Sequence, residues 1–326
     1  MYKMSKAEFF YNAFQGGLVA DALAMPVHWY YTPARIQEDY GAIDCFKAPK
    51  NPHPESILWR SSYQALNEKG EILHEQAQYW GQRDVHYHQF LQAGENTLNL
   101  QLARELYTHI VTRKAYDREE WSKHYVECMT QPNWHRDTYI EECHRGFFTR
   151  YAMGKPLLKC GIKDEHIGGL AQIPALLAAL ARLAEEEQRP LEREALRQSV
   201  REHLVLTHRH SNVIRAADCL TRLLWSLSEG ETLGDALMRD AGDWFSTKRA
   251  QTWRAQPDTA IIGQKISSAC YIDQAFPASL YLAWKYQADF VQGIQANAEV
   301  GGDNCHRGVV VGALLSPQTN CGAYFS

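Results

Sequence analysis

The sequence predicts an all-α fold, built as one compact domain over residues 1–326. Three observations predict it. Apolar residues recur at helical spacing along most of the chain, no stretch shows the alternating pattern of a strand or a βαβ rhythm, and no linker divides the sequence. With 326 residues, the chain is long enough for one large buried core.

The first helix is expected to begin at Ser5, because residues 5–8 read Ser-Lys-Ala-Glu. In this capping box the serine and the glutamate side chains each bind a free backbone N–H of the first turn. Aromatic and small residues then repeat at helical spacing as far as Leu18. Pro26 ends the helix, since proline removes a backbone donor and clashes with the preceding turn.

Further helices follow from the same periodicity and from end signals such as acidic first turns, glycine and proline. We expect them over 98–110, 117–131, 137–153, 170–187, 191–206, 212–227, a shorter stretch from 232, 276–286 and 289–299. A last helix of small apolar residues follows the glycine-rich loop at 301–308.

The irregular part of the chain is expected at about 41–94. This stretch is rich in proline, asparagine, histidine and aromatic residues. Loops of this length in a compact domain are usually functional or disordered, and the aromatic content argues against disorder. We therefore expect an ordered segment that covers the functional site.

Composition excludes several classes of protein. Hydrophobic residues make up 45% and charged residues 22%, as in ordinary soluble proteins. The net charge of −4 without a basic block argues against nucleic acid as a partner. The N-terminus predicts an amphipathic helix and not a signal peptide. No uninterrupted apolar run is long enough to predict a membrane-spanning helix.

The eight cysteines are irregularly spaced and form no C-x-x-C pair. This argues against a zinc ribbon and a disulfide framework, and favours reduced thiols in a cytoplasmic protein.

The most informative stretch for function is the loop 301–308, Gly-Gly-Asp-Asn-Cys-His-Arg-Gly. Glycines such as Gly302 let the backbone approach a ligand closely, and the helix start that follows offers free N–H groups and a positive dipole end. Asp303, Cys305 and His306 can all bind metal or take part in chemistry. Arg307 could hold a phosphate or carboxylate by a forked contact. We interpret the loop as half of an active site.

Two other segments could complete this site. Residues 16–28 carry Asp21 and His28 in an apolar context, and residues 93–99 form a polar helix start with Glu95 and Asn96. Acidic groups at two facing helix starts would make a cation site. A weaker signal comes from His86 and His88 of the irregular segment. In a strand these two side chains would point to the same side, where they could line a pocket or share an ion.

These segments, in this order, resemble the ADP-ribosylglycohydrolase family. The family pattern is a first helix ending G-D-A-L-G-x-x-x-E, a helix start T-D-D-T, and a late loop G-G-D-T-D-T before a small-residue helix. The sequences HIGGLAQIP at 166–174 and LTH at 206–208 are similar to two further family motifs, N-G-x-x-M-R-x-x-P and L-T-H. The similarity spans about 9–315 and implies a compact all-α fold.

The resemblance also implies an activity. Family members with complete motifs are hydrolases that bind two divalent metals, usually magnesium, and cleave the bond between ADP-ribose and a protein side chain or small molecule. On this chain, Glu95 and Asp303 are the acids kept at metal positions. His28 replaces the family glutamate, Asn96 replaces an aspartate, and the late loop carries softer donors.

The resemblance and the residues together define the expected site. The catalytic candidates are Glu95, Asp303, Cys305 and His306, and the metal candidates are Glu95 and Asp303. The substrate-binding candidates are Asp21, His28, His86, His88, Asn96, Gly168, Gly169, Gly302 and Arg307. The expected partner is a small-molecule or ADP-ribosylated substrate, with no nucleic acid and no membrane.

Three functional hypotheses remain open at this point. The first is hydrolysis of a glycosidic or related C–N bond on an ADP-ribose-like or small polar substrate, with Glu95 or Asp303 activating water. Magnesium prefers hard oxygen ligands, so His28, Cys305 and His306 favour a softer metal or none. The second is a metal-independent thiol enzyme, because a helix start beside His306 and Arg307 would lower the pKa of Cys305. The third is a non-catalytic ligand-binding family member.

Overall fold

The structure is a computed structural model that describes residues 4–318. Within this range the chain folds into helices and loops, and the only β-type pairing is three isolated bridges. The predicted all-α fold class is therefore confirmed. Cys321 lies outside the described residues.

The α-helices are α1 Lys6–Ala24, α2 Pro33–Tyr40, α3 Leu98–Arg113, α4 Arg118–Thr130, α5 Glu142–Ala152, α6 Ile173–Glu186, α7 Arg193–Leu204, α8 Ser211–Ser228, α9 Leu233–Asp240, α10 Thr247–Trp253, α11 Asp258–Ile261, α12 Ile272–Lys285, α13 Phe290–Glu299 and α14 Asn304–Leu315.

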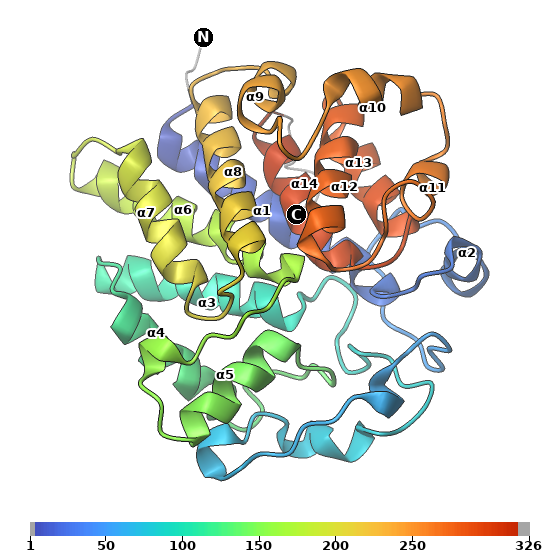
Figure 1. The fold of residues 1–326 in the computed structure, drawn as a ribbon, viewed down its shortest axis with the longest axis vertical. Coiled ribbons are helices and arrows are strands. Elements are labelled where there is room, and N and C mark those ends of the chain that lie inside the picture. The colour runs from blue at the N-terminus through green and yellow to red at the C-terminus, as the bar shows by residue number, and fades with distance from the viewer. Residues whose placement is uncertain (1–3, 319–326) are drawn as a thin grey trace.

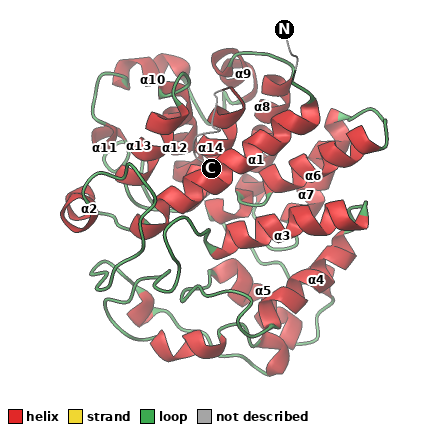
Figure 2. Cartoon of the chain, turned by 180° about the vertical axis from the view of Figure 1, so that it is seen from behind, coloured by secondary structure: helices red, strands yellow, loops and turns green. Residues whose placement is uncertain are grey.

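The two helices nearest the ends of the chain, α1 and α14, lie side by side through the centre of the molecule (Figures 1 and 2). Every residue of α14 is buried. The helices touch at two glycines: a Cβ added to Gly312 would lie 2.2 Å from the carbonyl oxygen of Gly16. This close contact brings the start of α14 next to the end of α1.

The other helices surround this central pair. On one side, α6 packs against α1 and α3 packs against α6; on the other side, α12 and α13 pack against α14. The helices α8 to α13 occupy one end of the molecule, while α4, α5 and the irregular segment occupy the other (Figure 1). The start of α14 therefore faces the irregular end.

Side-chain caps begin many of these helices. The hydroxyl of Ser5 accepts a hydrogen bond from the backbone N–H of Glu8 (3.2 Å), as the capping box predicts. Asp117 caps α4 in the same way, accepting from two backbone N–H groups at 2.8 and 2.9 Å. Thr232 caps α9.

The structure corrects several expected boundaries. The predicted helix at 137–153 begins only at Glu142, because Asp137 is held by the backbone N–H of Leu98 and by His88 and cannot enter a helix. The helix expected at 276–286 begins four residues earlier. Three short helices were not predicted, because their periodicity is weak: α2, α10 and α11.

The segment 41–94 contains no α-helix, only the 3₁₀ turns η2 Leu58–Arg60, η3 Glu68–Gly70 and η4 His74–Tyr79. It packs on α5 and lies along the lower edge of Figure 1. Leu58, Val85 and Tyr87 join Trp29 in a small apolar cluster separate from the main core. The segment thus places aromatic residues near the end of α1.

One helical stretch, Ile167–Glu186, is long and apolar enough to cross a membrane by length and composition alone. However, 78% of its most apolar window is buried inside the protein. Since a core helix of a soluble protein passes the same test, this stretch is weak evidence for a span. It includes the short 3₁₀ helix η6 Ile167–Leu170, which leads into α6.

Candidate active site

The late glycine loop is shaped by its backbone. Gly301 and Gly302 have φ of 69° and 70°, which L side chains rarely adopt. A Cβ on Gly302 would lie 2.0 Å from the carbonyl oxygen of Ser268. The backbone N–H of Asp303 donates to that same carbonyl (2.9 Å). The loop therefore holds Asp303 in a defined place at the start of α14.

Asp303 is the N-cap of α14 and the centre of the site. Its Oδ1 accepts hydrogen bonds from the backbone N–H of His306 (3.4 Å) and from His306 Nδ1 (2.8 Å). The same oxygen contacts Nε2 of His28 at 3.0 Å. His28 follows the turn that Pro26 forms at the end of α1, so the α1–α14 contact brings these residues together.

The histidines continue this contact in both directions. His28 Nδ1 lies 2.7 Å from His88 Nε2, and His88 Nδ1 lies 2.5 Å from Asp137 Oδ1. On the other side, His306 Nε2 lies 3.0 Å from Oε1 of Glu141. A buried row of three carboxylates and three imidazoles, with His88 and His28 in direct contact, thus runs from Asp137 to Glu141.

Proton counting assigns charges in this row. Its five contacts, Asp137–His88, His88–His28, His28–Asp303, Asp303–His306 and His306–Glu141, each need one proton. His306 faces a carboxylate oxygen with each of its two ring nitrogens, so it must carry both protons to bind Asp303 and Glu141 when these are ionised.

The pKa shifts support one arrangement. Burial lowers the pKa of His28 to about 4, so this ring is neutral. Burial opposes a charge on His306, but Asp303 and Glu141 raise its pKa well above the usual range. Burial likewise opposes ionised Asp303, yet the charge of His306 and the bonds from His28 and His306 keep the pKa of Asp303 well below its usual value. The Glu141 end of the row, formed by Asp303, His306 and Glu141, is therefore a carboxylate–imidazolium–carboxylate group.

Glu141 is held by the residues behind it. Asn99 Nδ2 donates to Glu141 Oε1 (2.9 Å), while Asn99 Oδ1 contacts Nε2 of His144 (2.8 Å). A Cβ on Gly168 would lie only 2.7 Å from Glu141 Oε2. Burial alone would raise the pKa of Glu141. The charge of His306 and its hydrogen bond outweigh this effect, so the pKa lies below its usual value.

A pocket of about 360 Å³ opens onto this row. Glu141 and Asp303 line it, with side chains 16% and 1% exposed respectively. Aromatic residues from four segments also line it, namely Trp29, Tyr31, Tyr87, Tyr139 and Tyr271. The pocket can therefore hold a ligand with flat or apolar parts against a base that carries negative charge.

Positively charged residues and a thiol also line the pocket. His166 and Cys270 line it together with Arg60. Burial opposes protonation of His166, but hydrogen bonds with Asp164 and Cys270 raise its pKa to about 11. Burial raises the pKa of Cys270, although His166 counteracts the shift. The thiol that faces the pocket is Cys270 and not Cys305.

The structure brings together four of the predicted residues: His28, His88, Asp303 and His306. Two of the predicted glycines lie beside them, Gly168 under Glu141 and Gly302 in the loop. Gly169 instead packs on His208 and Val213. His86 does not lie in a strand; its Nε2 donates to the carbonyl of Pro26 (2.9 Å) and thereby supports the turn before His28.

The expectation for Cys305 is wrong. Its side chain is fully buried, and its Sγ contacts the backbone carbonyl of Asp21 at 3.7 Å. Burial, together with the negative charges of Asp21 and Asp303, raises the thiol pKa well above its usual value. The helix start does not activate the thiol, because the sulfur points into the α1–α14 contact.

Glu95 does not join the site either. Its Oε1 pairs with Arg136, and its Oε2 accepts from the backbone N–H of Gln92 (2.7 Å). Asn96 Nδ2 donates to Leu18 O (2.8 Å) and to Asp21 Oδ2 (3.0 Å). The predicted cation site between facing helix starts therefore does not form.

Asp21 and Arg307 have structural contacts. Asp21 accepts hydrogen bonds from the backbone N–H (2.9 Å) and the hydroxyl (2.7 Å) of Thr97, which pins α1 to the start of α3. The guanidinium of Arg307 is buried and donates to Asn297 and to the carbonyl of Gly301 (2.7 Å). It shapes the glycine loop from behind and does not line the pocket.

Sequence reasoning missed several residues of the site. Asp137 and Glu141 fell inside a stretch expected to be helical, and Asn99 lay at the end of the polar helix start 93–99 without being named as a site residue. His166 lies within the glycine-bearing motif at 166–174, which could have indicated it as a site residue. No sequence pattern pointed to Trp29 or Cys270.

A pair of magnesium ions does not fit these donors. The Asp21 carboxylate is taken up by Thr97 and Asn96, and Glu95 is at the surface. His28, Asp303 and His306 do place ligand atoms within 4.8 Å of one another. Two of these three are nitrogen donors, whereas magnesium prefers an octahedron of oxygens. The three already bind one another, so we derive no catalytic step through a metal.

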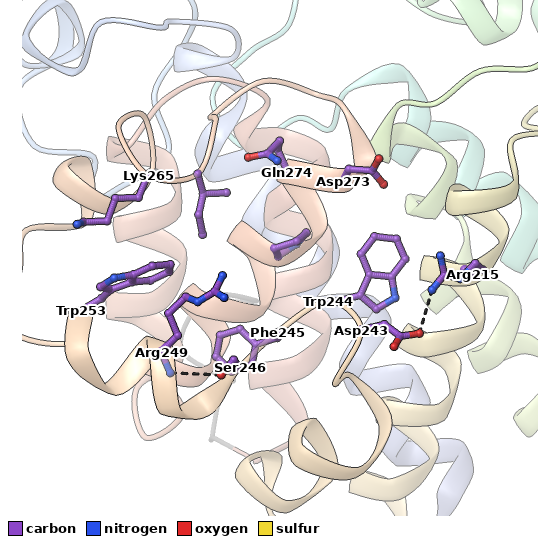
Figure 3. Close-up of a pocket in the computed structure, with 12 residues that line it drawn as sticks. Arg215, Asp243, Trp244, Phe245, Ser246, Arg249, Trp253, Lys265, Asp273 and Gln274 are labelled. Carbon is purple, nitrogen blue, oxygen red and sulfur yellow. Dashed lines mark hydrogen bonds and ion pairs between the residues drawn. The ribbon is translucent and has the colours of Figure 1, made fainter.

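A second hollow, also about 360 Å³, lies between α8, α10 and α12 (Figure 3). It is lined by Trp244, Trp253, Arg249 and Lys265, while Arg215 pairs with Asp243 (2.9 Å). None of the predicted site residues lines it. The carboxylate–imidazolium row therefore marks the pocket lined by Glu141 and Asp303 as the candidate active site.

The all-α fold, with a late glycine loop that presents an aspartate at a helix start, agrees with one known protein family. A family model described as ADP-ribosylglycohydrolase matches residues 3–317. The chain belongs to the ADP-ribosylglycohydrolase family.

Structural comparison agrees on the fold. A solved structure described as "ADP-ribosylglycohydrolase-related protein complex" is similar with a TM-score of 0.61 and 18% identity. The match covers 98% of this chain and 90% of that one. No curated protein sequence matches the chain significantly.

Proposed function

We propose that this protein is a hydrolase that cleaves a glycosidic or related C–N bond in an ADP-ribose-like substrate, using its own carboxylates. The observation that carries the proposal is the pair Asp303 and Glu141, bridged by His306 and facing one aromatic-lined pocket. Membership of a family of hydrolases supports the reaction class.

The electrostatics suit such a reaction. Cleavage of a glycosidic bond passes through a transition state with positive charge on the sugar. Fixed negative groups stabilise this charge without having to reorganise. Asp303 and Glu141 are both held ionised. Glu141, as the more exposed of the two, is the group placed to orient the attacking water.

The rest of the pocket suits the remainder of the substrate. Aromatic faces such as Trp29 and Tyr139 can stack on a base or sugar ring. Arg60 offers a forked donor set for a phosphate, and protonated His166 adds a second positive charge. The pocket thus combines negative groups for the reacting sugar with positive groups for phosphates.

The test compares three variants on ADP-ribosylated peptide and small ADP-ribosyl substrates. We expect E141Q and D303N each to lower kcat by about a hundredfold or more. E95Q is the matched control, since Glu95 is a surface acid paired with Arg136, and it should keep wild-type activity. Equal losses in all three variants, or none in E141Q and D303N, would contradict the proposal.

The same experiment addresses the non-catalytic alternative. Binding of ADP-ribose to the wild-type protein is measured by calorimetry alongside turnover. Binding without turnover of any tested substrate would replace the hydrolase by a ligand-binding family member. Absence of both would show that the pocket takes another chemistry.

A further inference from the structure

A second cluster of metal-binding residue types lies behind the pocket. It consists of Cys143 at the start of α5, Asp164 in the loop before η6, and His208 between α7 and α8. All three are buried, and their ligand atoms lie within 4.8 Å of one another. Three segments far apart in the sequence therefore meet at one point.

Two atoms of this cluster have no hydrogen-bond partner. They are Asp164 Oδ2 and His208 Nε2, and both side chains are at least nine-tenths buried. His208 Nε2 lies 3.9 Å from Asp164 Oδ1, too far for a hydrogen bond. Because unpaired buried polar atoms are costly and rare, these two atoms point to a missing bound group.

The other atoms of both residues are already committed. Asp164 Oδ1 accepts from the backbone N–H and from Nδ1 of His166, both at 2.9 Å. His208 Nδ1 contacts the hydroxyl of Thr207 at 2.9 Å. These bonds fix both side chains and leave one carboxylate oxygen and one ring nitrogen without a partner.

The cluster differs in this respect from the two other described groups of this kind. In His28, Asp303 and His306 the atoms bind one another, as shown above. In Glu105, His124 and Cys128 they do so as well: His124 Nε2 lies 2.6 Å from Glu105 Oε1 and 3.7 Å from Cys128 Sγ. Only the group containing Cys143 leaves donors free among the described residues.

The donor set selects the ligand. Thiolate sulfur, imidazole nitrogen and one carboxylate oxygen are the ligands of zinc and not of magnesium or calcium. We propose that Cys143, Asp164 and His208 bind one Zn²⁺. Binding converts the Cys143 thiol to a thiolate and releases its proton, and a water fills the fourth tetrahedral position.

A zinc ion here would link three segments of the chain. It ties the start of α5, which follows directly on Glu141, to the loop that carries His166 and to the α7–α8 junction. Zinc would thereby stabilise the part of the pocket formed by these residues. This inference does not depend on the proposed hydrolysis.

The test begins with metal analysis of tag-free protein after incubation with Zn²⁺ and desalting. We expect about one zinc per wild-type chain and almost none in C143S. C160S is the matched control, because Cys160 is another buried thiol that bonds only to backbone carbonyls. Removing zinc with a chelator should lower the Tm of the wild type by about 5 °C or more, and leave C143S unchanged.

Cobalt gives a second readout that does not require C143S to fold. Co²⁺ bound through a cysteine produces a sulfur-to-metal charge-transfer absorption, which the thiol-free group around His28 cannot give. We expect this absorption in the wild type, C160S and C128S. Loss in C128S would assign the metal to the other cluster, and no zinc uptake or absorption in the wild type would mean that a water bridges the free atoms. Either result overturns the proposal.

Discussion

At the scale of single residues, the same residue type takes opposite roles depending on what its side chain faces. Cys305 lies in the most promising motif of the sequence, yet its sulfur contacts the carbonyl of Asp21 in the core. Cys270 lies in the loop before α12, outside any motif, yet it lines the pocket together with His166. The two cysteines differ because of the direction in which each side chain points, and not because of their positions in the sequence.

This difference predicts the order of thiol labelling. With iodoacetamide at mildly alkaline pH, exposed Cys45 should react first and Cys270 next, while Cys305 should react only after unfolding, because a buried thiol is neither accessible nor ionised. Peptide mass spectrometry over time measures the order, with a urea-treated sample as the control. Labelling of Cys305 as fast as Cys270 in the native protein would show that its environment is not the one described.

The charge of Asp303 depends on its neighbours and not on the motif alone. The sequence motif predicts an acid at a helix start, and the structure agrees. Its chemistry is nevertheless set by His28 and His306, because they keep the carboxylate ionised despite complete burial. A motif can place a carboxylate, but the neighbouring rings decide its charge.

At the scale of elements, the contact between α1 and α14 decides whether the site exists. His28 follows α1 and Asp303 begins α14, so their 3.0 Å contact requires the two helices to pack closely. Gly16 and Gly312 permit this approach, since a side chain at either would overlap the backbone of the other helix.

Replacing Gly312 by alanine should therefore destabilise the protein by about 2 to 3 kcal/mol, because the helices must separate. Urea unfolding measures the change. Gly242→Ala is the control: a Cβ there meets nothing within 4 Å, so its effect should stay within about 0.5 kcal/mol. Equal effects of the two substitutions would argue against close helix packing at Gly312.

At the scale of the whole molecule, buried neutral histidines make stability depend on pH. Burial lowers the pKa of His28 and His53 to about 4 and that of His203 to about 3. In the unfolded chain these groups titrate near 6.5. Between about pH 6.5 and 4 the unfolded state thus binds more protons, so stability falls as the pH falls.

Each such histidine adds up to about 1.4 kcal/mol per pH unit to this slope. The free energy of unfolding, measured by urea titration between pH 7 and 4.5, should therefore decrease on acidification. H203Q, which replaces a histidine outside the candidate site, should reduce the slope by one histidine's share. A slope of opposite sign, or one unchanged in H203Q, would contradict the neutral buried state.

The sequence by itself determined most of the helices, though not the short helices α2, α10 and α11. Helical periodicity, caps such as Ser5 and Asp117, and the glycine loop before α14 all act over a few residues, and local physics is enough to read them. The family resemblance rests on the same local motifs and was confirmed over residues 3–317. His28, Asp303 and His306 were found for this reason.

Only the tertiary structure decided which polar groups meet. Glu95 has the composition of a site residue but lies at the surface beside Arg136, whereas Glu141 and Asp137 enter the row because α5 begins later than its pattern suggests. Hydrogen bonds and charges act between side chains that packing brings within about 3 Å. Spacing along the chain carries no record of that distance.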